Sequence, residues 1–250
     1  MTTGHVPQRG ISPFISSALS KLDPHLPLNQ DRCYWPVHVR IEVKGRKKSG
    51  SGPRHTGHRC AACPAKEDLT FVLHDFLQTA LSSDPAEISL LGVDLDPILI
   101  ERARERNPRP DRIIFECLDF LSEDSNRTLE EHLRRHEKLR FDVVFCFSVT
   151  MWIHLNYGDK GLVEFLRKAC SLTEMIVIEP QLWKCYRNAS RRLRRSKGED
   201  FPLLKTLKLT GDPTAHIENI LTESCNFRRV TVTADNEWKR RLLIYESSVR

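Results

Sequence analysis

The chain lacks a long hydrophobic run, so the sequence predicts no membrane-spanning helix. Its most apolar stretch, residues 141–152, contains Asp142 and several polar residues, and it is shorter than the ~20 residues that such a helix needs. The N-terminus carries Pro, His and Arg early and has no apolar core, so we expect no secretory signal. Disulfides are rare in reducing compartments, so we expect the eight cysteines to be free thiols in the cytoplasm, or alternatively the nucleus.

Glycine is missing between Gly57 and Gly92. Nucleotide-binding sheets often place a Gly-rich turn after their first strand, because only glycine lets the backbone approach the ligand so closely. Residues 60–68, which precede the first regular helical pattern, contain no such turn. Ser49–Gly52 lacks a following helix and the Gly-Lys-Ser/Thr ending, which excludes a phosphate loop of the P-loop type.

Positive charge is concentrated in the first quarter of the chain. The whole chain has 39 basic and 33 acidic residues, whereas residues 1–66 alone have 11 basic and three acidic ones. The stretch 44–53 has the composition of a flexible linker. We therefore expect residues 1–66 to form an atypical, basic and poorly ordered segment, and residues 67–250 to form the folded domain.

Two features of the N-terminal segment could be mistaken for ordered structure. Val37–Val43 alternates apolar and polar residues, which predicts a poorly ordered or edge strand, because a central parallel strand is apolar on both faces. The residues His55, His58, Cys60 and Cys63 are spaced closely in a Pro/Gly-rich stretch, unlike the separated ligand pairs of structural zinc sites. We expect no metal site.

Beyond residue 67, helical and strand patterns alternate. The expected helices cover Leu69–Leu81, Pro97–Arg106, Thr128–Glu137, Gly161–Cys170, Trp183–Arg195 and Ala215–Leu221. The expected strands cover Ile88–Val93, Ile113–Cys117, Phe141–Phe147, Met175–Ile178, Arg229–Thr233 and Arg241–Tyr245. This order predicts an α/β fold with a Rossmann-like, mostly parallel, doubly wound sheet. The closing pair of strands is typical of methyltransferases that use S-adenosylmethionine, and the first strand of such a sheet is missing or replaced.

Acidic residues follow two of the predicted strands. Asp94 ends one strand, where a carboxylate can accept hydrogen bonds from a ribose diol, whether of NAD or of S-adenosylmethionine. Asp96 precedes Pro97 and is expected to cap the next helix. Asp119 and Phe120 follow the next strand and could hold and flank an adenine; the alternative for Asp119 is a simple acidic loop start.

Two further segments carry aromatic and basic residues. Phe147–Asp159 is predicted to be a strand-end loop that brings Trp152, His154, Asn156 and Tyr157 together, suited to phosphate binding or base stacking. The second segment starts at Glu179, and its helix presents Trp183, Lys184, Arg187, Arg191, Arg194 and Arg195. That helix suits a phosphate backbone, and a solvated helix face is the alternative.

The sequences Ser-Val-Thr-Met-Trp-Ile-His-Leu-Asn-Tyr-Gly-Asp (148–159) and Ile-Glu-Pro-Gln-Leu-Trp-Lys-Cys-Tyr (178–186) resemble the bicoid-interacting family of RNA 5′-phosphate methyltransferases. The branch that methylates a γ-phosphate has lysine at the position of Met151, so the resemblance favours the 5′-monophosphate branch. The resemblance covers about residues 67–245 and implies O-methylation of small RNAs, such as a tRNA for histidine or precursor microRNA, by S-adenosylmethionine. We expect no membrane association and no obligate protein partner.

The resemblance also implies roles for individual residues. The methyl donor would be held by Asp94, Asp119, Phe120 and Phe147. The catalytic pocket for the RNA end would be formed by Trp152, His154, Asn156 and Glu179. The RNA-binding residues would be Trp183, Lys184, Arg187, Arg191 and Arg195.

The sequence departs from the family at the Gly-rich strand and turn that receives the methionine part of the donor, which residues 60–68 do not match. Two hypotheses therefore compete: an active enzyme, and a catalytically impaired relative that only binds RNA. An NAD-linked oxidoreductase is a third, weaker hypothesis, because the missing Gly-x-Gly turn counts against it as well.

Overall fold

The computed structural model describes residues 19, 37–39, 44–45, 69–81 and 86–248. The closely spaced residues of the N-terminal segment, His55, His58, Cys60 and Cys63, lie outside the described residues. Most of the basic segment 1–66 lies outside them as well. One buried residue of that segment is described: Leu19 is fully buried among the side chains of the core.

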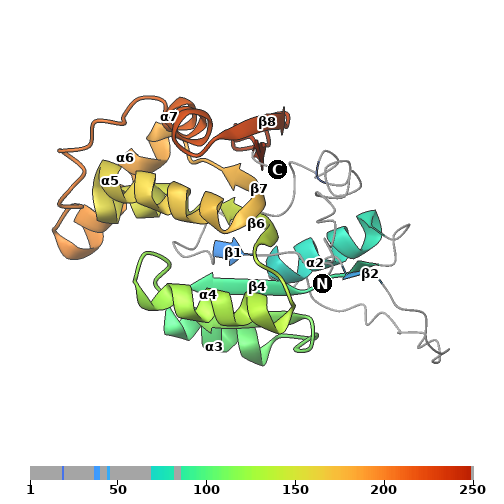
Figure 1. The fold of residues 1–250 in the computed structure, drawn as a ribbon. Helices are drawn as coiled ribbons and strands as arrows, with labels where there is room; N and C mark the ends of the chain where they lie inside the picture. The colour runs from blue at the N-terminus through green and yellow to red at the C-terminus, as the bar shows by residue number, and fades with distance from the viewer. Residues whose placement is uncertain (1–18, 20–36, 40–43, 46–68, 82–85, 249–250) are drawn as a thin grey trace.

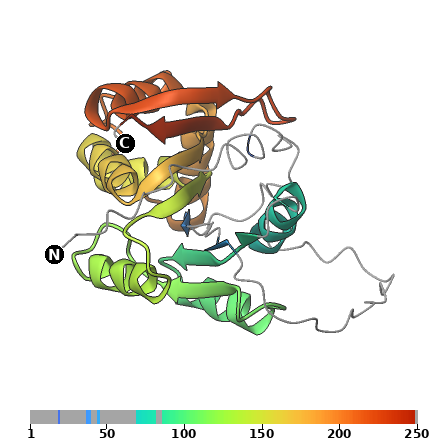
Figure 2. The ribbon, with the colours of Figure 1, turned by 45° about the vertical axis from the view of Figure 1, so that its right-hand side comes forward.

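A seven-stranded sheet forms the centre of the fold, in the order β5-β4-β1-β6-β7-β9-β8. Its strands are β1 (Val37–Val39), β4 (Leu90–Asp94), β5 (Ile113–Cys117), β6 (Phe141–Phe147), β7 (Thr173–Glu179), β8 (Phe227–Val232) and β9 (Leu243–Ser247). The strands β4, β5, β6 and β7 are parallel to one another, while β1 and β9 run against their neighbours. Figure 2 shows β8 and β9 side by side at one edge. A second, two-stranded sheet pairs β2 (Lys44–Gly45) with β3 (Ala86–Glu87).

The strand β1 occupies a central position, so the expected edge position is wrong for Val37–Val39, whereas residues 40–43 lie outside the described residues. Val37 pairs with Val93 of β4, and Val39 pairs with both Leu91 of β4 and Val144 of β6, in antiparallel register. The backbone groups of β4 and β6 that face each other need hydrogen-bond partners. A short strand of either direction supplies them, and here an antiparallel strand fills this position between two parallel ones.

Helices cover both faces of the sheet, as expected for a doubly wound fold (Figure 1). The helices are α2 (Leu69–Ala80), α3 (Pro97–Glu105), α4 (Asp124–Arg135), α5 (Thr150–Ser171), α6 (Trp183–Lys197), α7 (Pro213–Asn219) and the π-helical turn η1 (Ile220–Ser224). One core cluster joins α4, α5, α7 and η1 to one face, and another joins α2 and α3 to the opposite face. The predicted Rossmann-like fold is confirmed, although the sheet is mixed rather than mostly parallel. Most element ends shift by a few residues, whereas α5 begins at Thr150 instead of Gly161.

The segment after β6 is helical from Thr150, so the expected loop over Phe147–Asp159 is wrong beyond Val149. Helix α5 begins at Thr150 and contains a kink at Gly158, which has φ 69° and ψ −170°. Positive φ is strained for other residues, so Gly158 lets two helical pieces join where the sequence pattern indicated a loop. No helix among the described residues is long and apolar enough to cross a membrane.

Gly92 permits close packing between β4 and β5. A Cβ atom at this position would lie 2.7 Å from Cδ1 of Phe115, whose ring is buried in the core. We therefore expect Gly92→Ala to lower the free energy of unfolding by about 1–3 kcal/mol, because the added methyl group overpacks the core. Urea denaturation measures this loss.

Leu139→Ala provides the control, because the side chain of Leu139 is 82% exposed and its loss should change stability by less than about 0.5 kcal/mol. Equal stability of Gly92→Ala and the wild type would show that the two strands do not pack as described.

Candidate functional site: a cavity at the carboxyl ends of the parallel strands

The chain reverses its direction of winding between β4 and β6. From β4 it continues outward to β5, and it then returns to β6 and continues to β7 on the other side, leaving β1 between the two halves. In open α/β sheets, ligands bind beside the carboxyl ends of the strands at such a switch point. A cavity of about 820 Å³ opens at this place.

Two helix faces and two strand ends form the walls of this cavity. Helix α5 and the residue before it contribute every third or fourth position, namely Val149, Trp152, Ile153, Asn156 and Tyr157. Helix α6 does the same with Ala189, Arg192, Leu193, Ser196 and Lys197. The remaining walls are residues 93–96 at the end of β4, residues 118–120 after β5, and residues 199–202. The spacing i, i+3, i+4, i+7, i+8 places each set on one side of its helix.

Asp94 is the most buried acidic residue of the cavity wall. Its side chain is 8% exposed, and its Oδ1 accepts a 2.8 Å hydrogen bond from the backbone N–H of Asp96. Its Oδ2 is buried and has no hydrogen-bond partner among the described residues. Burial raises the pKa of the Asp94 carboxyl, and the backbone hydrogen bonds oppose that shift. A buried oxygen without a partner carries a large desolvation cost, so it is well placed to accept a hydrogen bond from a ligand.

Asp96 has the capping role that the sequence predicts. Its Oδ1 accepts hydrogen bonds from the backbone N–H groups of Ile98 and Leu99, and Pro97 occupies the first turn of α3. These bonds satisfy donors that a helix start leaves free. Asp94 and Asp96 therefore have different roles in one short segment. Asp96 caps α3, and Asp94 has a carboxylate oxygen left to accept a hydrogen bond from a ligand.

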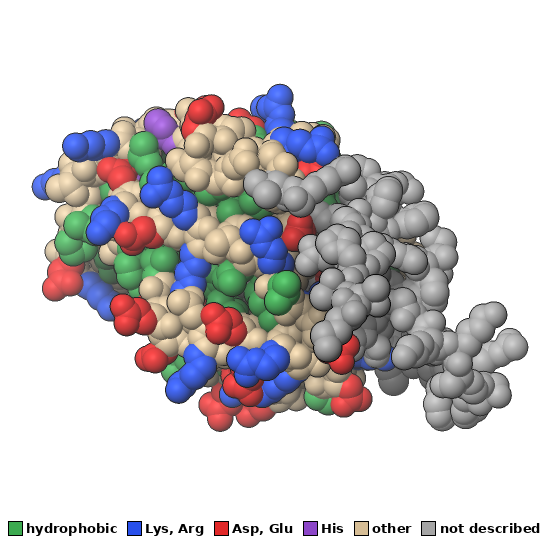
Figure 3. All heavy atoms as spheres, in the orientation of Figure 1, with side chains coloured by type: hydrophobic (Ala, Val, Ile, Leu, Met, Phe, Trp, Pro, Cys, Tyr) green, Lys and Arg blue, Asp and Glu red, His purple; other side chains and the backbone are tan. Residues whose placement is uncertain are grey.

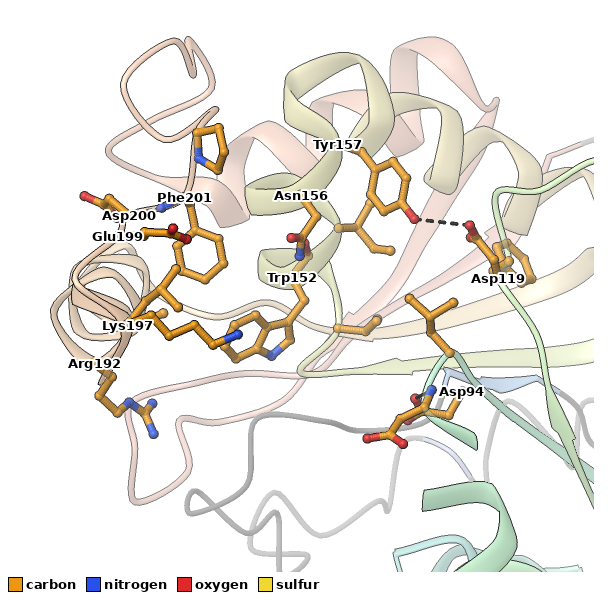
Figure 4. A pocket seen from close by; sticks show the side chains of 18 of the residues that line it. Asp94, Asp119, Trp152, Asn156, Tyr157, Arg192, Lys197, Glu199, Asp200 and Phe201 are labelled. Carbon is orange, nitrogen blue, oxygen red and sulfur yellow. Dashed lines mark hydrogen bonds between the residues drawn. The ribbon is translucent and has the colours of Figure 1, made fainter. Parts of the chain in front are cut away.

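Asp119 and Phe120 also lie in the cavity wall, after β5. The Oδ1 of Asp119 accepts from the backbone N–H of Leu121, and its Oδ2 accepts from the Tyr157 hydroxyl at 3.2 Å (Figure 4). Desolvation and the nearby Asp119 raise the pKa of Tyr157. Because Tyr157 is 40% exposed, a ligand could replace its hydroxyl at Asp119.

The basic residues of the cavity wall are Arg192 and Lys197, which the sequence analysis did not single out. Figure 4 shows them across the cavity from Asp94, with Trp152 and Asn156 between. The helical spacing could have identified them. Arg192 and Lys197 lie on the same helical face as the apolar Ala189 and Leu193, and an apolar face of a helix usually packs toward the rest of the protein.

The predicted RNA-binding residues Lys184, Arg187, Arg191 and Arg195 are exposed and do not belong to the cavity wall. Trp183 packs instead against Tyr186, with ring centroids 4.7 Å apart. Helix α6 therefore carries two sets of basic residues. Arg192 and Lys197 line the cavity, and the predicted RNA-binding residues lie outside its wall and face solvent.

His154 is fully buried and lies outside the cavity wall. Its Nε2 lies 2.8 Å from Oδ1 of Asp159, and its Nδ1 lies 3.1 Å from the hydroxyl of Tyr186 on α6. Asp159 also accepts hydrogen bonds from the backbone N–H groups of Lys208 and Leu209. Burial lowers the pKa of His154, although Asp159 opposes that shift. This geometry makes His154 a link between α5, α6 and residues 208–209.

Glu179 belongs to a buried polar cluster at the ends of β6 and β7. Its carboxylate accepts hydrogen bonds from the Ser148 hydroxyl, from Nδ2 of Asn236 at 3.3 Å and from Nη1 of Arg240 at 3.5 Å. The side chain of Glu179 is fully buried and that of Arg240 is 12% exposed. Burial raises the pKa of Glu179, and Arg240 is the main opposing influence. The cluster lies outside the cavity wall, unlike the RNA-end pocket expected for Glu179.

Phe147 likewise lies apart from the cavity. It is buried in the core on the α2 side of the sheet, with its ring centroid 5.4 Å from that of Phe145. The expected contact between Phe147 and a methyl donor therefore has no counterpart in this cavity. Of the eight residues assigned to donor binding or catalysis, the structure brings together Asp94, Asp119, Phe120, Trp152 and Asn156. Among the described residues, no cluster of His, Cys, Asp and Glu has the arrangement of a metal site.

Comparison with known proteins finds a family model and relatives that match the region of these motifs. The family model described as Bicoid-interacting protein 3 (Bin3) matches residues 141–247. The Pre-miRNA 5′-monophosphate methyltransferase of Xenopus laevis is 40% identical over 181 residues, which are 72% of this chain and 71% of that protein. The chain belongs to the Bin3 family. Another relative, the RNA 5′-monophosphate methyltransferase of Bos taurus, is 42% identical over 176 residues, or 70% of this chain and 60% of that protein.

Solved structures with distant similarity include two methyltransferases. The N-methyltransferase NodS of Bradyrhizobium japonicum is 14% identical, with a TM-score of 0.39 over 63% of this Bin3-family chain and 72% of that one. The magnesium protoporphyrin IX methyltransferase of Synechocystis is also 14% identical, with a TM-score of 0.40 over 70% of each chain.

The buried ion pair at the end of β7 generates a prediction about stability. Arg240→Met should lower the free energy of unfolding by about 3–5 kcal/mol, because it leaves the Glu179 carboxylate buried without a cation. Without Arg240 the pKa of Glu179 rises further, so Glu179 favours the folded state only while it is protonated. The loss should therefore be larger at about pH 8 than at about pH 5, as measured by urea denaturation.

Arg241→Met is the matched control, since Arg241 pairs with Asp235 in an exposed ion pair (side chains 59% and 37% exposed). It should cost less than about 1 kcal/mol at either pH. Equal losses for the two variants would contradict the buried cluster.

Proposed function

We propose that this chain is an S-adenosylmethionine-dependent methyltransferase that O-methylates the 5′-monophosphate of small RNAs. The observation that carries the proposal is the cavity at the switch point, with Asp94 and Asp119 at one end and Arg192, Lys197 and aromatic side chains at the other, where Glu199 and Asp200 also line the wall. The substrate class is precursor microRNA, in keeping with the name of the Xenopus relative, together with a tRNA for histidine, as the resemblance implies.

The acidic end fits the adenosine part of the methyl donor. The Oδ2 of Asp94 is buried and lacks a partner, so it can accept a hydrogen bond from a ribose hydroxyl. Asp119 lies one strand further and can accept from the adenine amine, while the buried ring of Phe120 lies beside it in the wall. Carboxylates in this part of the cavity also favour the positive charge of a sulfonium.

The opposite end fits an anionic RNA terminus. Arg192 and Lys197 bring positive charge to the wall, and the amide of Asn156 lies between the two ends, where its Nδ2 donates to the backbone oxygen of Trp152 at 2.8 Å. A terminal phosphate carries close to two negative charges at neutral pH. The guanidinium of Arg192 can bind two of its oxygens at once. The exposed Lys184, Arg187, Arg191 and Arg195 are available on the other side of α6 for the following phosphates.

The chemistry needs alignment more than it needs a base. The donor supplies an electrophilic methyl group, which passes from the sulfonium to a phosphate oxygen, leaving S-adenosylhomocysteine and an RNA 5′-methyl phosphate. The phosphate oxygen is already anionic, so no proton has to be removed. Arg192 and Lys197 hold the phosphate and screen its charge. Asp94 holds the ribose of the methyl donor, so that the two reactants stay aligned.

A specific observation supports the second hypothesis, a relative that binds RNA without methylating it. The slot of the first parallel strand is filled by the antiparallel β1, and its Val37 end lies beside Val93 at the carboxyl end of β4. The family's Gly-rich turn would leave the sheet at this position. If no other segment receives the methionine part of the donor, the cavity keeps its RNA end and loses its catalytic function.

A transfer assay distinguishes the two hypotheses. The full chain would be incubated with radiolabelled S-adenosylmethionine and a short RNA that carries either a 5′-monophosphate or a 5′-hydroxyl. We expect label in the monophosphorylated RNA alone, and removal of its terminal phosphate before the reaction should abolish labelling. Arg192→Gln should reduce transfer about tenfold or more, because a charge-assisted hydrogen bond contributes ~1.5–3 kcal/mol.

Arg134→Gln is the control, because it removes the same charge from an exposed position on α4 that lies outside the cavity wall and apart from α6; transfer should be unchanged. RNA binding without any transfer would support the non-catalytic hypothesis, and equal labelling of the 5′-hydroxyl RNA would overturn the proposed substrate.

A further inference from the structure

Two aromatic rings meet in the cavity wall beside the basic residues. Trp152 of α5 and Phe201, which follows α6, have ring centroids 6.2 Å apart and planes inclined by 58°. Both residues line the cavity, and both are only partly buried (Figure 4). Figure 3 shows hydrophobic side chains gathered in a hollow of the surface, with basic and acidic side chains around them.

The position of Phe201 is fixed by its local structure. Gly198 ends α6 with φ 72° and turns the chain back toward the cavity. The carboxylate of Asp200 accepts a 2.8 Å hydrogen bond from the backbone N–H of Phe201 and lies 3.7 Å from Nε of Arg194. The carbonyl of Phe201 accepts a hydrogen bond from Leu204. These two hydrogen bonds fix the backbone of Phe201, and its side chain packs against the core cluster that includes Met151 and Leu155 of α5.

The geometry of the two rings limits what they can bind. Stacked bases lie about 3.4 Å apart, so a flat ring inserted between two others needs a gap of about twice that distance between parallel planes. The planes of Trp152 and Phe201 are neither parallel nor far enough apart. A flat ligand can instead lie against the face of one ring and touch the edge of the other, so the pair forms a corner.

From this corner we propose that Trp152 and Phe201 bind the base of the first nucleotide of the RNA, in an unpaired and unstacked state. The inference rests on the proposed function, because it is the 5′-phosphate that brings the first nucleotide into the cavity. Arg192 and Lys197 line the same end of the cavity, together with Glu199 and Asp200, and would pair with the phosphate of that nucleotide. Base–aromatic stacking tolerates every base, so the corner selects an exposed base face rather than a particular sequence.

The test compares RNAs that differ only at the first nucleotide. Fluorescence anisotropy would give the affinity for a 5′-monophosphorylated single-stranded RNA, for the same RNA with an abasic first nucleotide, and for a hairpin whose first base is paired at a blunt end. We expect the single-stranded RNA to bind at least about fivefold more tightly than either of the other two, since stacking of one base contributes at least that much.

Phe201→Leu, which keeps an apolar side chain and removes the ring, should bring the ratio between the intact and abasic RNA close to one, and Phe201→Tyr should preserve it. Equal binding of intact and abasic RNA by the wild type would overturn the inference, and that comparison does not depend on the folding of any variant. A ratio that Phe201→Leu leaves unchanged, in protein with an unchanged melting temperature, would overturn it as well.

A parallel measurement with 5′-hydroxyl RNA reports on the proposed function separately. If the wild type prefers the 5′-monophosphate but ignores the base, the substrate is right and the corner is wrong. If it has no preference for the phosphate, the proposed function itself fails.

Discussion

The site depends on one buried carboxylate at the point where the sheet reverses its winding. Asp94 ends a fully buried strand, so its side chain is removed from water at the position where α/β sheets bind ligands. One oxygen is satisfied within its own loop, and the other has no partner among the described residues. Because such an oxygen is costly to bury, the fold maintains a binding group at the expense of stability.

The central strands and their acidic ends could be predicted from the sequence, because their signals are local. Buried parallel strands appear as short apolar runs, which places Asp94 and Asp119 directly after β4 and β5. The cap formed by Asp96 follows from its position before Pro97. The family resemblance rested on motifs after β6 and β7, and both lie within the region 141–247 that the Bin3 model matches.

The remaining features depend on contacts between distant segments. The central position of β1 follows from the need of β4 and β6 for a partner, which the alternating pattern of residues 37–43 does not reveal. The buried role of His154 depends on Tyr186, which is 32 residues away. Arg191 and Arg192 are adjacent in the sequence, and only the packing of α6 on α5 decides that Arg192 faces the cavity. Counting basic residues could not separate the two faces of that helix.

Calorimetric titration with S-adenosylhomocysteine tests the central role of Asp94 most directly. The soluble, folded wild type should bind it, and Asp94→Asn should bind it about tenfold or more weakly, because the variant loses a charge-assisted hydrogen bond. Asp111→Asn, which removes the same charge from an exposed position, should bind as the wild type does. Absence of heat with the wild type, or equal affinity of wild type and Asp94→Asn, would contradict the account.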